Sequence, residues 1–255
     1  MAGQTMNQSC PQWDMTSVNR ISLEPAFVLH TRPYQETSLI VELFTKSYGR
    51  GNAVAKGAKR PKSPLRSVLT PVSRLSISLS GKSELKNLST AEILDLYPLS
   101  NGASLNSVIY INELITKATE KEDPHEIIFN KYQNFLENIS LNYSPDDIEM
   151  LLRNFVMTLL QEMGYGIDLT RDAETNTKLK KEANYRFDPN KGFTIITAGN
   201  RPKISFLGKD IIEFSEGKFE KKSVRLSSKI IMRTALDYHL GNRSLNIRKY
   251  LKKNN

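Results

Sequence analysis

The spacing of apolar residues changes once along this chain, at Pro98, and this change restricts the fold more than any other feature. Before it, residues 75–80 alternate strictly between apolar side chains and serines, the period-two pattern of a strand with one wet face. After it, apolar residues recur three or four positions apart, which is typical of helices. The sequence therefore predicts an α+β chain, with a strand-rich domain at residues 24–98 and a helical domain at residues 99–255.

The strand-rich domain contains five strand-like segments joined by short turns, without helices between them. They are residues 26–30, 37–45, 52–55, 75–80 and 84–97. Five strands in roughly 75 residues fit a five-stranded Greek-key barrel of the oligonucleotide-binding kind, the OB-fold. A small open sheet is the alternative. Residues 1–23 are expected to form a disordered extension, because most of this segment is polar and shows no sustained period.

Three amphipathic segments follow Pro98, and the third has the clearest ends. The segments are residues 105–118, 128–139 and 144–163. In the third, Ser144 and Asp147 match a capping box, Pro145 takes the first helical position, and Gly164 suits a left-handed helix end. Because this helix is apolar around much of its circumference, we expect it at the centre of a bundle.

Residues 170–220 interrupt the helical domain with a region of loop and hairpin. Residues 171–182 are polar and aperiodic, and residues 185–196 read as a hairpin with Asp-Pro-Asn-Lys-Gly as its turn. Residues 201–219 fit a short strand followed by an irregular segment. A last long helix is expected at residues 223–240.

Positive charge is concentrated in the strand-rich domain. The chain has a net charge of +9 and a pI near 9.5. Residues 30–90 alone carry eleven Lys and Arg against three acids. Charge of one sign gathered in one segment favours a polyanionic partner more strongly than a high pI does.

The densest part of this charge is residues 56–66, Lys-Gly-Ala-Lys-Arg-Pro-Lys-Ser-Pro-Leu-Arg, with five cations and no acid. Its glycine and two prolines exclude the interior of a helix or a central strand, so a basic loop is expected. Contact with nucleic acid is one interpretation, and a mobile, solvated connection is the other. The DNA-contacting candidates are Arg32, Tyr34, Lys56, Lys59, Arg60, Lys62, Arg66, Arg74, Lys82 and Lys86. Tyr34 is proposed to stack on bases, whereas Phe27 and Phe44 are expected in the core from their strand parity.

No reactive constellation is recognisable, so no catalytic residue, cofactor or metal is expected. Gly81-Lys-Ser lacks the earlier glycine of a phosphate-binding loop, and the three histidines share no ligand spacing. The single cysteine, Cys10, excludes an intrachain disulfide and favours a reducing compartment. No apolar run of membrane-spanning length and no export signal are present, which predicts a cytoplasmic protein.

Several segments, in order, resemble the RecO family of bacterial DNA-repair proteins. The matching segments are Ala26-Phe-Val-Leu-His-Thr-Arg-Pro-Tyr-Gln-Glu-Thr-Ser-Leu39, Val54-Ala-Lys-Gly-Ala-Lys59, Leu105 with Tyr110-Ile-Asn-Glu-Leu114, Leu159-Leu with Met163-Gly-Tyr-Gly166, Tyr185-Arg-Phe with Lys191-Gly-Phe193, and Arg233-Thr-Ala-Leu with His239-Leu-Gly-Asn-Arg-Ser-Leu-Asn-Ile-Arg248. They extend over about residues 24–250. Such collinear matches are far more specific than any one motif.

The resemblance implies a non-enzymatic recombination mediator of the RecF pathway, associated with the nucleoid. Such proteins bind single- and double-stranded DNA, anneal complementary strands, and work with RecR. They help to load RecA onto DNA coated by single-strand-binding protein. Some members carry a four-cysteine zinc module, but residues 170–185 of this chain contain no cysteine, so zinc is not expected. An RNA-binding OB-fold protein is the alternative, because charge does not separate RNA from DNA.

The resemblance also implies that the helical domain captures the acidic, apolar C-terminal tail of single-strand-binding protein. The basic candidates for this contact are Arg225, Arg233, Arg243 and Arg248. For each one, a cation that complements a helix dipole is an equally good interpretation. A hydrolase would require a pocket with convergent titratable groups.

Overall fold

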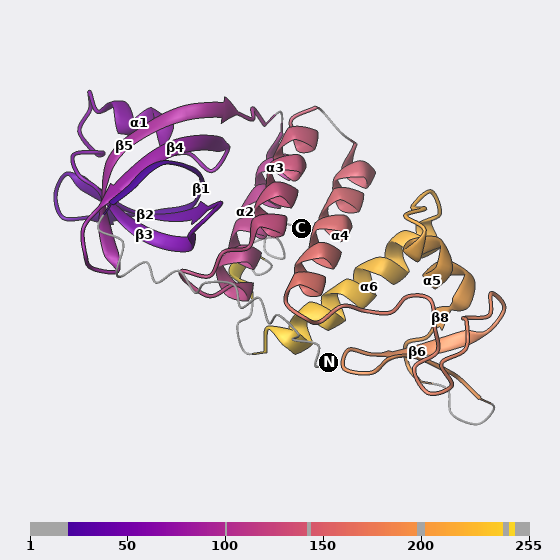
Figure 1. Ribbon diagram of the computed structural model, residues 1–255. Helices are drawn as coiled ribbons and strands as arrows, with labels where there is room; N and C mark the ends of the chain where they lie inside the picture. The colour runs from indigo at the N-terminus through magenta and orange to yellow at the C-terminus, as the bar shows by residue number, and fades with distance from the viewer. Residues whose placement is uncertain (1–19, 100, 142–143, 198–201, 242–244, 248–255) are drawn as a thin grey trace, which may run out of the picture.

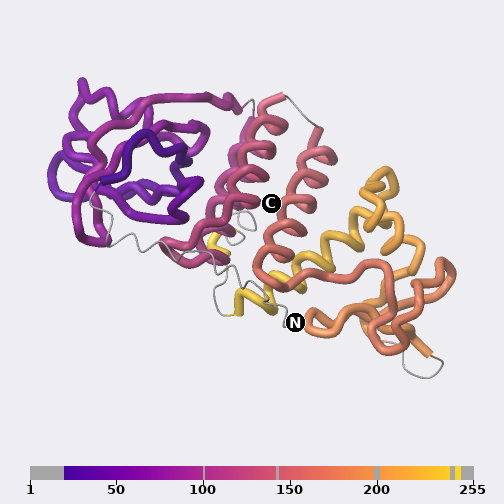
Figure 2. Tube along the Cα trace, in the orientation of Figure 1, coloured from indigo at the N-terminus to yellow at the C-terminus, as the bar shows by residue number. Residues whose placement is uncertain are grey.

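The computed structural model describes residues 20–99, 101–141, 144–197, 202–241 and 245–247. An N-terminal barrel is followed by a helical bundle, and a small three-stranded sheet lies at the far end of the molecule (Figure 1). The colour along the tube shows the chain passing through α2, α3 and α4 to the small sheet, and α6 then running back toward the bundle (Figure 2). Within the described residues, no helix is both long and apolar enough to cross a membrane.

Five strands close the barrel in the order β1-β2-β3-β5-β4. They are β1 (Arg20–Tyr34), β2 (Ser38–Thr45), β3 (Gly49–Ala55), β4 (Ser73–Ser80) and β5 (Leu85–Leu96). β3 and β5 pair in parallel, and the other neighbours are antiparallel. Small and branched side chains such as Ala26, Val28 and Ile77 fill the interior. The predicted five-stranded barrel is confirmed, and the open sheet is excluded.

The expected extension at residues 1–23 is wrong at its C-terminal end, because β1 already begins at Arg20. Ile21 is 1% exposed and pairs with Leu79. A shift in register between Ile21 and Glu24, with Leu23 at a φ of 54°, breaks the alternation that would have revealed this strand. Residues 1–19 lie outside the described part of the chain.

The basic segment between β3 and β4 is a loop only as far as residue 63. Helix α1 (Pro64–Val68) occupies its end, which the sequence did not predict. Pro64 is the first helical residue, where the missing N–H breaks no hydrogen bond and the fixed φ suits the helix. A proline that rules out a helix interior is therefore compatible with a helix start.

The bundle is built from α2 (Gly102–Ala118), α3 (Glu126–Ile139), α4 (Pro145–Glu162) and α6 (Lys222–His239). The predicted capping box of α4 is present, since Ser144 and Asp147 exchange side-chain and backbone hydrogen bonds. Gly164 follows the helix with a φ of 79°. Helix α4 packs against α2, α3 and α6, which confirms its predicted central position.

The insertion in the helical domain contains β6 (Asn184–Asp188), β7 (Gly192–Ile195), β8 (Phe206–Leu207) and α5 (Gly208–Ser215). The predicted hairpin is β6–β7, and its turn is held by the Asp188 carboxylate, which accepts from two backbone N–H groups. The segment expected to be irregular after the short strand is instead α5. This helix has only eight residues and no side-chain cap at its start, so the capping residues that mark the start of a helix were missing from the sequence.

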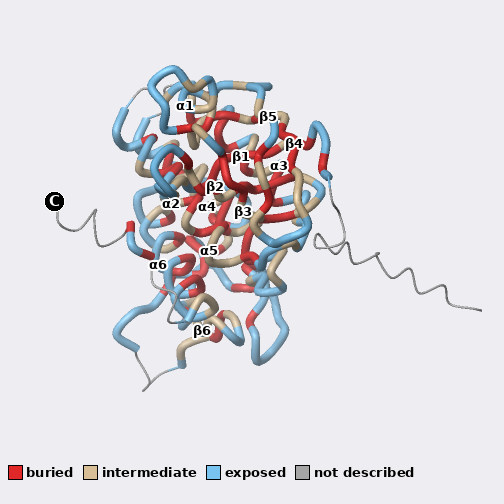
Figure 3. Tube along the Cα trace, turned by 90° about the vertical axis from the view of Figure 1, so that its left-hand side faces the viewer, coloured by how far each residue is buried: buried red, intermediate tan, exposed pale blue. Residues whose placement is uncertain are grey.

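Barrel and bundle are joined by an aromatic cluster on the outer face of the barrel. Phe27 and Phe44, both fully buried, pack on Phe129 and Tyr132 of α3, with ring centroids 4.8–5.6 Å apart. They belong to the helical core and not to the barrel interior, although their expected burial is confirmed. Buried segments therefore continue from the barrel strands into the helices (Figure 3).

Polar contacts fix the same junction. The Arg50 guanidinium of β3 donates to the hydroxyl and carbonyl oxygens of Thr119 at the end of α2, at 2.9 and 2.6 Å. The Asn112 amide of α2 donates to the Leu29 carbonyl at 3.1 Å. At Gly49, an added Cβ would lie 2.2 Å from the carbonyl oxygen of Asp123, so the two parts meet without room for a side chain.

Candidate nucleic-acid interface

The basic loop lies against the β1–β2 turn and is fixed to the barrel. The Lys59 backbone N–H donates to the Thr37 carbonyl at 2.8 Å, and the Lys59 ammonium reaches the Gln35 carbonyl at 3.4 Å. Ala58 is fully buried in the barrel core. This anchoring argues against the alternative of a freely mobile connection.

Six of the ten predicted DNA-contacting residues are exposed cations on this loop, on α1 and at the end of β1. We call them the basic face: Arg32, Lys56, Lys59, Arg60, Lys62 and Arg66. Within the described part of the chain, none of the six has a carboxylate oxygen within 4.0 Å. Their charge is therefore available to an external anion.

Arg32 connects the basic face to two neighbouring segments. It lines a pocket of about 140 Å³ with Glu84, from the β4–β5 turn, and Lys121, which follows α2. Lys121 is exposed, and it was not among the predicted contacts because it lies far from the barrel strands along the chain. Lys82 is exposed in the same β4–β5 turn.

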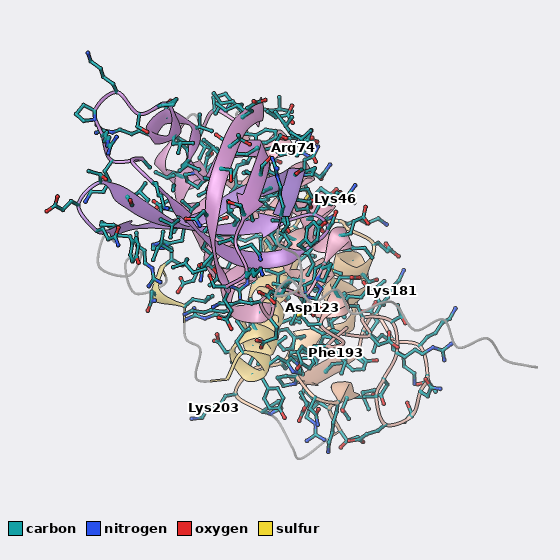
Figure 4. The ribbon with its side chains drawn as sticks, turned by 60° about the vertical axis from the view of Figure 1, so that its left-hand side comes forward. Lys46, Arg74, Asp123, Lys181, Phe193 and Lys203 are labelled. Atoms are coloured by element: carbon teal, nitrogen blue, oxygen red, sulfur yellow. The ribbon has the colours of Figure 1, made fainter. Side chains whose placement is uncertain are left out.

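Two predicted contacts, Lys86 and Arg74, already have partners within the chain. Lys86 is 1% exposed, and its ammonium donates to the Gly81 carbonyl at 3.0 Å inside the β4–β5 connection. Arg74 pairs with Asp95 at 2.7 Å and donates to the Gln133 side chain of α3 at 2.7 Å (Figure 4). Because both side chains have structural partners, they are weaker candidates for a phosphate contact than the six exposed cations.

Tyr34 lies at the end of β1, opposite Ser38 in the register, and is half-buried. Its position beside the basic loop agrees with the predicted stacking role without testing it. Tyr48, another aromatic residue of the barrel domain, is partly buried against the barrel core.

The basic residues of the helical domain differ in their surroundings. Arg225 donates to the carbonyl oxygens of Phe219 and Glu220, both at 2.9 Å, and pairs with Asp146 at 3.1 Å. These contacts tie α6 to the start of α4. Arg233 is exposed, with Asp237 3.7 Å away on the same helix. Arg243 and Arg248 lie outside the described residues.

Arg153, in the middle of α4, is a basic residue that the sequence analysis missed. Its side chain is 12% exposed, it faces Glu149 at 3.6 Å, and its Nε atom is buried without a hydrogen-bond partner. Burial lowers the pKa of the Arg153 guanidinium, and the neighbouring Glu149 carboxylate acts in the opposite direction. The sequence does contain a signal for Arg153, because it is a cation within the apolar pattern of α4. Cations are rarely buried unless they are paired.

Two protein-family models match this chain, one over the barrel and one over the helical part. The family model described as "Recombination protein O N terminal" matches residues 20–97, and "Recombination protein O C terminal" matches residues 99–246. The chain belongs to the RecO family. It is 39% identical over 234 residues to the DNA repair protein RecO of Nitrosospira multiformis, which covers 91% of this chain and 96% of that protein. It is 35% identical to the same-named protein of Aromatoleum aromaticum, covering 93% and 98%, and 36% identical to that of Actinobacillus pleuropneumoniae serotype 7, covering 87% and 91%.

RecO family membership makes this chain a DNA repair and recombination protein that acts as a non-enzymatic mediator. The family also implies DNA binding. In the part of the chain that the structure describes, no three His, Cys, Asp or Glu side chains are placed to hold a metal ion. The RecO region that carries zinc ligands in some members is here organised around a carboxylate: Asp172 accepts backbone N–H groups from Thr175, Glu174 and Ile195 at 2.7–3.0 Å.

Proposed function

We propose that this protein binds the backbone of single- and double-stranded DNA through the basic face and anneals complementary strands there. The observation that supports this is the set of six exposed cations on the β3–β4 connection and the end of β1, none of which has a carboxylate partner among the described residues. Lysine and arginine side chains neutralise phosphates without reading sequence. They offset the repulsion between two strands and leave the base edges free to pair.

The wider role proposed is that of the family resemblance. The protein works with RecR in the cytoplasm, at the nucleoid, and helps to load RecA onto DNA coated by single-strand-binding protein. The helical domain supports capture of an acidic tail through Arg153, which has an unpartnered Nε atom, and exposed Arg233. Arg225 is a weaker candidate, because three contacts within the chain already use its guanidinium.

Strand annealing with complementary oligonucleotides tests the proposal. The variant changes Lys56, Lys59, Arg60 and Lys62 to Ala. If each residue contacts one phosphate, the slope of log affinity against log salt for single strands falls by about 3, at roughly 0.7 per contact. Annealing at moderate salt should slow at least tenfold.

A matched control changes four cations that lie elsewhere, Lys131, Lys191, Lys203 and Lys218, to Ala, with the same loss of charge. Equal annealing by the wild type and the basic-face variant would refute the site. Equal slowing by both variants would show that net charge matters and position does not. Competition between matched DNA and RNA oligonucleotides tests the RNA-binding alternative, which predicts preferential binding of RNA.

A further inference from the structure

A second group of exposed lysines lies on the small-sheet part of the molecule. Residues 178–181 read Lys-Leu-Lys-Lys, and Lys209 lies in the first turn of α5. We call Lys178, Lys180, Lys181 and Lys209 the lysine surface. All four are exposed, whereas Leu179 between the first two is 7% exposed and packs in the core. The alternation therefore directs Lys178 and Lys180 away from the core.

The two segments that carry these lysines are held together by backbone contacts. The Lys209 N–H donates to the Lys181 carbonyl at 2.9 Å, and the Lys180 N–H donates to the buried Tyr185 hydroxyl at 2.8 Å. At Gly208, an added Cβ would lie 2.1 Å from the Lys180 carbonyl oxygen. The spacing of the lysine-bearing segments is thus fixed by the fold.

The positive charge of the lysine surface is not neutralised by the neighbouring acids. Within the described residues, none of its four ammonium groups lies within 4.0 Å of a carboxylate. Two acids of the same region are engaged elsewhere, Glu213 by Lys221 and Glu216 by Lys218. Glu182 follows Lys181 and Asp210 follows Lys209 in the sequence, and Asp210 is buried and accepts a hydrogen bond from the Ser223 hydroxyl. The four lysines outnumber these two acids, so the cluster stays positive.

The lysine surface and the basic face lie at opposite ends of the molecule, with the bundle between them (Figure 1). Figure 4 labels Lys181 and Lys203 at two different edges of the lower half of the view, below Arg74 and Lys46 of the barrel domain. Fields of exposed charges are screened within about 10 Å at 0.1 M salt. Two anionic polymers bound at the two ends would therefore not repel each other strongly.

We propose that the lysine surface is a second binding site for a nucleic-acid backbone, so that one protein molecule holds two separate strands. This inference rests on the proposed function for the first site, the basic face. A row of closely spaced cations on an extended segment suits a polymer with regularly repeated negative charge. Holding a second strand on the same molecule raises its effective concentration near the first, which favours annealing.

A bridging assay tests this proposal. A single-stranded oligonucleotide is attached to beads, the full-length protein is added, and a labelled, non-complementary second strand is offered. Changing Lys178, Lys180, Lys181 and Lys209 to Gln should leave binding to the bead strand within twofold and reduce capture of the labelled strand at least tenfold. The matched control changes Lys131, Lys191, Lys203 and Lys218 to Gln and should bridge like the wild type. Restoring the four positions as Arg should restore bridging.

Two further arms separate the outcomes. The basic-face variant should retain weak DNA binding that the four Gln substitutions abolish. If its binding equals that of the wild type, the proposed first site fails while the lysine surface is still tested by the Gln variant. Mixing the two variants should not restore bridging, and restoration would overturn the claim that one molecule holds both strands. The proposed second site is overturned if the Gln variant bridges two strands as the wild type does. It is also overturned if the Gln substitutions weaken only the binding of an acidic peptide, measured in parallel, and leave the binding of DNA unchanged.

Discussion

Asp172 is expected to hold the small-sheet part together in place of a metal. Its Oδ1 atom accepts from the Glu174 and Thr175 N–H groups at 3.0 and 2.8 Å and from the Thr175 hydroxyl at 3.1 Å. Its Oδ2 atom accepts from the Ile195 N–H of β7 at 2.7 Å. One carboxylate, 3% exposed, thus joins a loop to the sheet.

Changing Asp172 to Asn keeps one acceptor oxygen and turns the other into a donor. Either the N–H groups of Glu174 and Thr175 or the N–H group of Ile195 then loses its acceptor. An unsatisfied buried donor lowers the free energy of unfolding by about 1–3 kcal/mol. Changing Asp172 to Ala removes both acceptors, and we expect a loss of about 3 kcal/mol or more. Asp188→Asn is the matched control, because Asp188 also caps two N–H groups but lies in an exposed turn, and it should cost less than about 1 kcal/mol.

The effect of Asp172 should also depend on pH. Burial raises the pKa of the Asp172 carboxyl, but the hydrogen bonds from Thr175, Ile195 and Glu174 outweigh burial and leave the pKa below its ordinary value. A carboxyl with a lowered folded-state pKa stabilises the fold above the unfolded pKa of about 3.9, and this stabilisation is lost as the pH falls through the folded pKa. The difference between wild type and Asp172→Asn in the free energy of unfolding should therefore stay nearly constant from pH 7 to pH 5, and it should narrow as the pH falls below about 4.

Urea unfolding followed by circular dichroism measures the free energies, and hydrogen exchange of peptides spanning residues 172–195 reports the local opening. Faster exchange in this segment is expected for the Asp172 variants alone. If Asp172→Asn unfolds at the same urea concentration as Asp188→Asn, with unchanged exchange, the carboxylate does not organise this region.

Three other substitutions test the junction and the corrected site. Phe129→Ala should lower the free energy of unfolding by about 3–5 kcal/mol, because the ring fills the barrel–bundle contact, and Phe129→Leu should cost less; equal urea midpoints would contradict this. Gly49→Ala should lower the free energy of unfolding by about 2–4 kcal/mol, because Gly49 has a positive φ and an added Cβ would clash with the Asp123 carbonyl. Gly164→Ala is the control, because Gly164 has a similar φ but open space around it, and it should cost about 1 kcal/mol. Similar thermal shifts for the two variants would refute the close approach at Gly49. Lys86→Ala should destabilise by about 1–3 kcal/mol and leave the salt slope of DNA binding unchanged, because the ammonium is buried; a slope lowered by one contact would restore Lys86 to the site.

The features predicted correctly from the sequence depend on residues close together in the chain. The capping box of α4 spans four residues, and the β6–β7 turn spans five. Strand parity likewise predicted that Phe27 and Phe44 are buried. Local pattern is sufficient where neighbours along the chain determine the geometry.

The errors arise where distant contacts or irregular backbone decide the outcome. The start of β1 was hidden by a register shift, and α5 is short and lacks the capping residues that mark the start of a helix. Arg74 finds its partner Gln133 59 positions away, which no local pattern reveals. Lys86 lies on β5, whose register is interrupted twice along β4, so counting along the strand did not show which face it occupies.

The eleven cations of residues 30–90 divide into two groups with different physical roles. Four have partners that build the barrel or fix it to the bundle: Lys46 with Glu126, Arg50 with Glu42 and Thr119, Arg74 with Asp95 and Gln133, and Lys86 with the Gly81 carbonyl. The other seven, the basic face and Lys82, are exposed and have no carboxylate partner among the described residues. The barrel packs the aromatic residues of one side on α3, and the seven exposed cations lie outside that aromatic contact. Contact with the bundle thus supplies partners for Lys46, Arg50 and Arg74, and the cations that we propose for DNA binding are those left without a carboxylate partner among the described residues.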